Sequence, residues 1–243
     1  MNLPGGLYAP PLAHRGLWSS TGAPENSLAA FDAACTAGYG IELDVRLSAG
    51  GEAMVFHDET LERMTGAADA LAALTARALG EQALKGGPER IPTLAQTFER
   101  IAGRGLVLVE LKAVPNPRGE LEAAVAAVLD AYSGPAAVIS FDAGALAWFA
   151  AHLPDVPRGL DAAGFADEDL ADSAGDLEGG LAALIEHARP HFLVLQLQTA
   201  LGRLAARYRA NGLPVLAWTV RSAADAATVA KGADNFIFEG FAA

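Results

Sequence analysis

The sequence predicts an α/β fold, a distorted (β/α)8 barrel of the TIM type with a small insertion after the second strand. The chain has 243 residues, the usual size of such a barrel. Short apolar runs alternate with helical patterns along most of its length. A doubly wound open sheet is the competing fold, but no G-x-G-x-x-G follows the first apolar run.

Eight apolar runs are predicted to be the parallel strands of the barrel. The run at 106–112 is almost continuous in Leu and Val, as expected of a strand buried on both faces. The eight predicted strands span 12–15, 40–47, 106–112, 136–141, 158–161, 192–197, 214–220 and 236–239.

The second predicted strand carries two carboxylates on one face. Glu42 and Asp44 are two residues apart, so both side chains point to the same side of an extended chain. Only residues 48–52 separate this strand from the apolar run 53–57, and a parallel crossover needs a dozen residues or more. We therefore expect an antiparallel hairpin, which returns His57 toward Asp44.

The predicted helices follow the apolar period of 3.6 residues. The first begins after Pro24-Glu25-Asn26-Ser27, with Asn26 or Ser27 as its cap, and another begins at Thr93 with capping-box spacing to Gln96. Five further helices are predicted at 118–132, 143–153, 180–189, 200–211 and 222–231. Residues 59–92 have weak periodicity and predict an insertion with short helices. We interpret 1–243 as one barrel domain that carries this insertion.

Composition limits the classes of partner. The formal net charge of −12 argues against nucleic acid as a partner, and the single cysteine, Cys35, excludes disulfides within one chain. The start, Met1 to Pro10, lacks the basic and apolar regions of a signal peptide, and no 18-residue stretch is free of polar residues. We expect a cytoplasmic protein without stable membrane insertion, and the oligomeric state is left open.

Polar residues gather at the carboxyl ends of the predicted strands, where active sites of such barrels lie. Glu42, Asp44 and Glu110 come from neighbouring strands. Because their donors are all oxygens, they favour Mg²⁺ or Ca²⁺ over zinc. We predict that the three acids bind one divalent cation, and the sequence does not choose between the two ions.

Other strand-end residues predict proton transfer and phosphate binding. His14 or His57 alone is typical of a hydrogen-bonded core histidine, but as a pair beside acids they are candidates for proton donor and acceptor, in either assignment. Arg15 and Lys112 either hold a phosphate or simply neutralise the carboxylates by ion pairing. Trp218, late in the seventh strand, is a predicted substrate contact.

Together these residues predict an enzyme that hydrolyses a phosphodiester. A divalent cation, an arginine and a lysine suit a phosphoryl group, and two histidines suit displacement at phosphorus. No G-x-x-x-x-G-K-[ST] loop is present, which excludes a P-loop nucleotide enzyme.

A set of short motifs runs along most of the chain, namely His14-Arg15-Gly16, Pro24-Glu25-Asn26-Ser27, Glu42-Leu43-Asp44-Val45, Val55-Phe56-His57-Asp58, Ile91-Pro92-Thr93-Leu94, Val109-Glu110-Leu111-Lys112, Ser140-Phe141 and Ala217-Trp218-Thr219-Val220. In these motifs and in their order, the sequence resembles the glycerophosphodiester phosphodiesterase family. The resemblance implies a metal-dependent hydrolase that releases sn-glycerol 3-phosphate and an alcohol. It also implies metal binding by Glu42, Asp44 and Glu110, catalysis by His14 and His57, and phosphate contacts from Arg15 and Lys112.

Two departures from the family pattern concern Arg221 and the last strand, which ends Phe238-Glu239-Gly240. We expect both at the pocket rim, away from the metal and proton-transfer positions. Two alternatives to the hydrolase of small diesters are a lysophospholipase D that acts on an acyl-bearing diester and a non-catalytic module.

Overall fold

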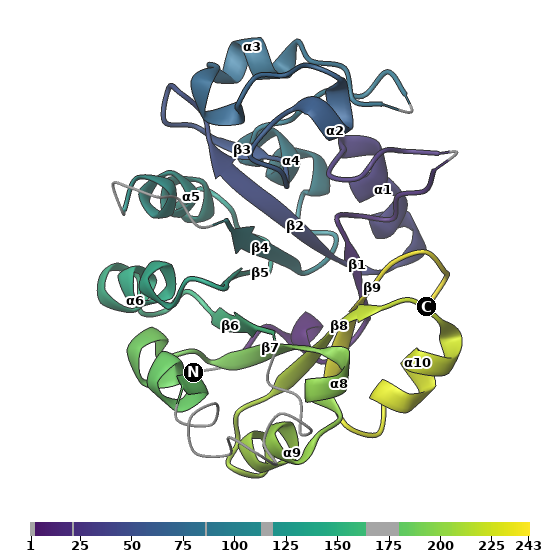
Figure 1. The fold of residues 1–243 in the computed structure, drawn as a ribbon, viewed down its shortest axis with the longest axis vertical. Coiled ribbons are helices and arrows are strands. Elements are labelled where there is room, and N and C mark those ends of the chain that lie inside the picture. Colours follow the sequence, from purple (N-terminus) through teal and green to yellow (C-terminus); the bar gives the residue numbers. More distant parts are fainter. Residues whose placement is uncertain (1–2, 21, 86, 113–118, 164–179) are drawn as a thin grey trace.

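The barrel predicted from the sequence is confirmed. A computed structural model describes residues 3–20, 22–85, 87–112, 119–163 and 180–243. Within these residues, parallel strands follow the order β1-β9-β8-β7-β6-β5-β4-β2, and pairing of β1 with β2 closes the ring (Figure 1). The eight parallel strands are β1 (Leu12–His14), β2 (Gly40–Leu47), β4 (Val107–Leu111), β5 (Ala136–Ser140), β6 (Arg158–Ala162), β7 (Phe192–Gln196), β8 (Val215–Val220) and β9 (Asn235–Phe238). Each agrees with its predicted range to within one residue at either end.

Helices cover the outside of this ring (Figure 1). Those between the strands are α1 (Leu28–Ala37), α4 (Leu94–Ile101), α5 (Glu120–Asp130), α6 (Ala143–His152), α8 (Leu197–Ala200), α9 (Arg203–Ala210) and α10 (Ala223–Val229); residues 180–188 are also helical, and a 3₁₀ turn, η1 (Gly5–Leu7), precedes β1. The helix expected at 200–211 is instead two, α8 and α9, because Gly202 is extended (φ −84°, ψ 174°). Residue 118, the expected start of α5, lies outside the described residues.

The core has an inner and an outer layer because successive strand residues face opposite sides. Inward-facing side chains such as Leu108, Val194 and Ile237 fill the barrel, and the opposite face packs beneath the helices. Gly159 permits one close approach, because a Cβ there would lie 2.2 Å from the ring of Phe192. The barrel interior is therefore a packed core below its open end.

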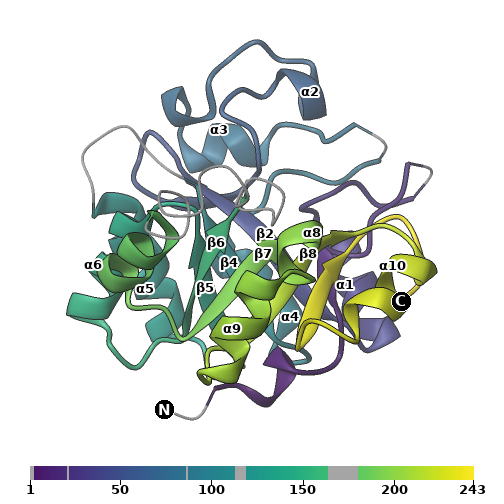
Figure 2. The same cartoon turned by 60° about the horizontal axis from the view of Figure 1, so that its bottom comes forward.

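The predicted hairpin is also present. β3 (Ala53–Val55) runs antiparallel to β2, with Val45 opposite Val55. The insertion that follows contains α2 (Glu62–Thr65), the 3₁₀ turn η2 (Leu71–Ala73) and α3 (Ala76–Gly80). It extends beyond one end of the barrel in Figure 2. Its apolar side chains form a small cluster of their own with residues of the hairpin, namely Met54, Phe56, Leu61, Leu71, Leu79, Leu84 and Ile91.

In the part of the chain described above, none of the helices combines the length and the hydropathy that crossing a membrane requires.

A half-exposed ion pair joins α9 to the start of β8 and β9. Asp234 accepts hydrogen bonds from Arg209 Nε at 3.0 Å and Nη2 at 2.9 Å, and from the backbone N–H of Val215 at 2.8 Å. Burial alone would raise the pKa of Asp234, but Arg209 and the Val215 amide outweigh it and hold the pKa below its usual value.

Asp234→Asn is therefore expected to lower the free energy of unfolding by about 1 kcal/mol at pH 7, since solvent screens a half-exposed pair. Urea unfolding at pH 7 measures this loss, with exposed Asp155→Asn as control. A carboxylate with a lowered folded-state pKa stabilises the fold above its unfolded value of about 3.9, and loses that effect as pH falls through the folded value. The gap between wild type and variant should thus narrow below about pH 4. A gap that is independent of pH contradicts the assignment.

Candidate active site

The predicted site residues meet around one cavity of about 130 Å³ at the carboxyl ends of the barrel strands. Six of the eight line it directly; Asp44 contacts Lys112, one of these six, and Arg15 contacts Asp44. The lining residues are His14, Glu42, His57, Glu110, Lys112, Ile139, Phe141, Asp161, Trp218 and Ile237.

The three acids converge as predicted. The β2–β4 register places Asp44 directly beside Glu110, and one oxygen from each of Glu42, Asp44 and Glu110 lies within 4.8 Å of the others. All three are buried. Burial and the charges of Asp44 and Glu110 raise the pKa of Glu42 well above its usual value. Burial and the charge of Asp44 raise the pKa of Glu110 to about 7.

This donor set fits a hard divalent cation. Glu42 Oε2 accepts a hydrogen bond from the backbone N–H of Arg15 at 3.1 Å, but Glu42 Oε1 is buried without a hydrogen-bond partner among the described residues. A buried carboxylate oxygen without a partner is costly, and acids packed together repel. A cation coordinated by the three carboxylates would remove both penalties.

Two basic side chains contact the same acids. Lys112 Nζ lies 2.7 Å from Asp44 Oδ1 and 2.5 Å from Glu110 Oε1, and Arg15 Nε lies 3.3 Å from Asp44 Oδ2. Burial alone would raise the pKa of Asp44, but Lys112 and Arg15 outweigh it and hold the pKa well below its usual value. The ion pairs weighed in the sequence analysis are thus present, with Lys112 lining the cavity and Arg15 bound to Asp44 next to it.

His14 is paired with Glu239, a residue that the sequence analysis expected at the pocket rim. Glu239, which follows β9, lies with Oε2 2.6 Å from His14 Nδ1, and Arg221 Nε donates to Glu239 Oε1 at 2.7 Å. The expectation that these two departures lie away from the proton-transfer positions is therefore wrong. Pairing of β1 with β9 brings together residues that are 225 positions apart in the sequence. His14 Nε2 lies 3.9 Å from Glu42 Oε2.

His57 is held by the acid next to it. Its Nδ1 lies 2.7 Å from Asp58 Oδ1, and Asp58 accepts a hydrogen bond from Arg63 Nε at 2.5 Å. Burial is the main cause that lowers the pKa of His57.

Arg63 also binds a second site residue. This side chain of α2 contacts Glu25 Oε1 at 2.7 Å and Oε2 at 2.9 Å, and Arg15 contacts the same Glu25 at 2.8 Å. One arginine of the insertion thus joins the carboxylate that holds His57 to the carboxylate that holds Arg15.

Sequence reasoning missed further polar residues of the site. Asn26 was one of two candidate helix caps, but Ser27 makes the cap, accepting from the Ala30 N–H at 3.2 Å. Asn26 is buried instead and donates from Nδ2 to Asp44 Oδ2 at 2.7 Å. Asp161 was not selected, although it is an acid near the end of a predicted strand, which was the available signal.

Aromatic side chains form one wall. The rings of Trp218 and Phe141 meet edge to face, with centroids 5.6 Å apart. Phe141 is 44% exposed, so apolar surface borders the opening of a charged cavity. Trp218 therefore lines the cavity, and its contact with a substrate stays a prediction.

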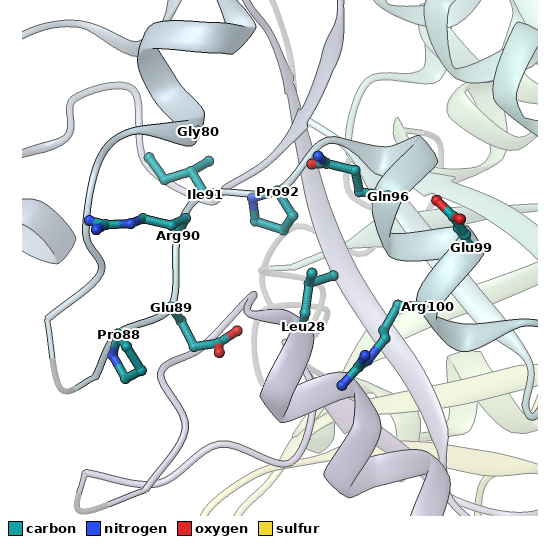
Figure 3. A pocket seen from close by; sticks show the side chains of 10 residues that line it. All are labelled: Leu28, Gly80, Pro88, Glu89, Arg90, Ile91, Pro92, Gln96, Glu99 and Arg100. Carbon is teal, nitrogen blue, oxygen red and sulfur yellow. The ribbon is translucent and has the colours of Figure 1, made fainter.

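A larger cavity of about 780 Å³ lies elsewhere, between the end of the insertion, the start of α1 and the helix α4 (Figure 3). Leu28 and Pro92 border it on one side and Glu99 and Arg100 on another (Figure 3). None of the predicted site residues lines it. Chemistry rather than volume therefore identifies the smaller cavity as the candidate active site.

Sequence comparison agrees with the motifs. The profile of the Glycerophosphoryl diester phosphodiesterase family matches residues 14–237. A glycerophosphodiester phosphodiesterase of Caldanaerobacter subterraneus subsp. tengcongensis is 40% identical over 109 residues, which are 42% of this chain and 44% of that protein. The chain spans about half the length of the curated relatives it matches, 44% and 52% for two of them.

Structural comparison extends the similarity to nearly the whole chain. A phosphodiesterase of Oleispira antarctica in complex with the product sn-glycerol-3-phosphate aligns with a TM-score of 0.81 and 27% identity, covering 94% of this chain and 91% of that one. A glycerophosphodiester phosphodiesterase from Thermotoga maritima aligns with a TM-score of 0.73 and 26% identity, covering 93% and 92%.

Proposed function

Because the chain belongs to the glycerophosphoryl diester phosphodiesterase family, we propose that it hydrolyses glycerophosphodiesters to sn-glycerol 3-phosphate and an alcohol. The observation that carries this proposal is one small cavity lined by two histidines, a lysine and two of the three clustered acids, Glu42 and Glu110, with the third, Asp44, beside them. The relatives do not favour the lysophospholipase D alternative. The expected partner is a small molecule, and the cytoplasm stays a prediction from the sequence.

Glu42, Asp44 and Glu110 are the residues that would hold a divalent cation, Mg²⁺ or Ca²⁺. When bound, such an ion polarises a phosphoryl oxygen and neutralises the charge that develops there. Arg15 and Lys112 stand beside these acids and supply the remaining positive charge. Their contacts with Asp44 and with Glu25 or Glu110 limit their rotamers, so little side-chain entropy is lost when they bind a phosphate.

The two histidines are oriented for proton transfer in the same way. His14 directs Nδ1 to Glu239, and His57 directs Nδ1 to Asp58, so each imidazole keeps Nε2 for the substrate. A carboxylate at Nδ1 favours the tautomer with its proton there and stabilises the imidazolium when Nε2 takes a second proton. One imidazole accepts a proton from the attacking water molecule as its oxygen bonds to phosphorus, and the other protonates the oxygen of the departing alcohol as its bond to phosphorus breaks.

The direct test measures release of sn-glycerol 3-phosphate from glycerophosphocholine and glycerophosphoethanolamine, with Mg²⁺, with Ca²⁺ and with a chelator. Release that depends on either metal supports the proposal. Folded protein that releases no product under any of these conditions contradicts it. Faster turnover of a monoacylated diester than of its deacylated form would favour the lysophospholipase D alternative, and metal binding without turnover would favour the non-catalytic module.

Arg63→Gln is expected to lower kcat/KM about tenfold, because charge-assisted hydrogen bonds to Asp58 and Glu25 are lost and both His57 and Arg15 become less well oriented. Arg63→Lys should recover part of the rate, since it restores the charge without the planar fork. The matched control is Arg77→Gln, which removes an exposed arginine of the same insertion from its pair with Glu81. Arg63→Gln turnover equal to that of the control would remove Arg63 from this role.

A further inference from the structure

A carboxylate that the mechanism does not use faces the active-site cavity. Asp161 lies near the carboxyl end of β6, is 5% exposed and lines the same 130 Å³ space as the two histidines. Its Oδ1 is buried and has no hydrogen-bond partner among the described residues.

Strand geometry explains why Asp161 points inward. Gly159 lies two residues earlier on β6 and faces the ring of Phe192 inside the barrel, so Asp161 shares that inner face. Across the β6–β7 pairing Asp161 is level with Val194, which also belongs to the inner layer. The carboxylate therefore points into the barrel, at the end of the strand where the apolar core meets the cavity.

A donor without a partner lies on the same wall. Trp218 Nε1 is buried and has no hydrogen-bond partner of good geometry in the described chain, although the indole lies close to Asp161. Burial and the charge of Glu110 raise the pKa of Asp161 well above its usual value, and the nearby indole opposes this rise only in part. Burial of an acceptor and a donor without partners costs free energy in the folded protein. Such atoms in a folded protein call for an explanation, and a bound group that pairs with them supplies one.

We infer that Asp161 is a specificity-determining residue, whose free oxygen accepts a hydrogen bond from a hydroxyl group of the substrate's glycerol moiety. This inference rests on the proposed function. A hydroxyl both donates and accepts, so one glycerol hydroxyl group matches the Asp161 oxygen and a second, or the same one, matches the Trp218 N–H. The cavity is small, about 130 Å³, which suits a compact polyol better than an acyl chain. A site built to pair a hydroxyl rejects an analogue that lacks it, because its own polar atoms are then left unpaired.

The test compares two monophosphates of equal carbon length, sn-glycerol 3-phosphate and n-propyl phosphate, by calorimetric titration of the metal-loaded protein. Wild type should bind the hydroxylated ligand at least about tenfold more tightly. Asp161→Ala should bring the ratio of the two affinities toward one by weakening only sn-glycerol 3-phosphate. Asp161→Asn keeps an acceptor oxygen of the same size and should retain part of the preference. Exposed Asp155→Ala is the control.

The inference is overturned if wild type does not prefer sn-glycerol 3-phosphate, or if Asp161→Ala weakens both ligands equally or neither of them. It is also overturned if the variant changes only the rate ratio between glycerophosphocholine and a glycerophosphodiester of a neutral alcohol, since that would place Asp161 at the head group. Absence of diester turnover in wild type contradicts the proposed function instead, and the binding ratio still decides the role of Asp161. Thermal unfolding of Asp161→Asn shows whether the isosteric variant is folded.

Discussion

His57→Ala and His14→Ala are each expected to lower kcat by about 10²–10⁴-fold while the protein stays folded, because each removes one proton transfer at the phosphodiester. Neither imidazole belongs to the apolar core, and each is bound mainly by one carboxylate, Glu239 or Asp58. Turnover of glycerophosphocholine with metal present measures the loss, and thermal unfolding monitors the fold.

The control for the histidine variants is His152→Ala, which removes an exposed imidazole from the end of α6 and should leave turnover unchanged. If both histidines act in one concerted displacement, the double variant should be little slower than the worse single variant. A histidine whose alanine variant keeps a near-normal rate would have no part in proton transfer.

Glu42→Gln is expected to lower kcat/KM by at least about 100-fold, because the loss of one carboxylate charge weakens a site that supplies several kcal/mol of transition-state stabilisation. The amide is isosteric and its oxygen still accepts the hydrogen bond from the Arg15 backbone N–H, so the loop that carries Arg15 keeps its support. Calorimetric titration with Mg²⁺ and Ca²⁺ should show weaker binding in parallel with slower turnover.

The matched control for this variant is Glu122→Gln, another buried glutamate, which accepts a hydrogen bond from the Gly119 N–H at 2.9 Å at the start of α5. Glu122→Gln removes a buried negative charge outside the site. It should lower the free energy of unfolding more than it weakens metal binding. Wild-type turnover that resists an excess of chelator would contradict the metal assignment, whatever the variants do.

The predicted site residues that the structure brings together share a local signature. Glu42 and Asp44 are two apart on one strand, and the short linker at 48–52 left no alternative to the hairpin that returns His57. Glu110 and Lys112 repeat the same spacing on the adjacent strand, so the register of β2 and β4 brings all of them together. The alternation of side chains along a strand and the length of a loop are properties of short segments. They can therefore be interpreted without knowledge of the rest of the chain.

The partners that the sequence did not reveal are distant in the chain. Glu239 reaches His14 only because the barrel closes through β1 and β9, and Arg63 reaches Glu25 only because the insertion folds back beside the first loop. The sequence made Asn26 a candidate helix cap, because an asparagine side chain can either cap a helix or bind a buried carboxylate. Only the position of Asp44 in the folded chain shows that Asn26 does the second.

The sequence by itself therefore determined the (β/α)8 architecture, its strands to within one residue, and the acids, histidines and cations that meet at one end. Tertiary structure decided which carboxylate holds which imidazole, and that Asp161 faces the cavity with a free oxygen. The physical reason is that periodicity fixes the face on which a side chain lies, whereas its partner depends on closure of the barrel, to which the whole chain contributes.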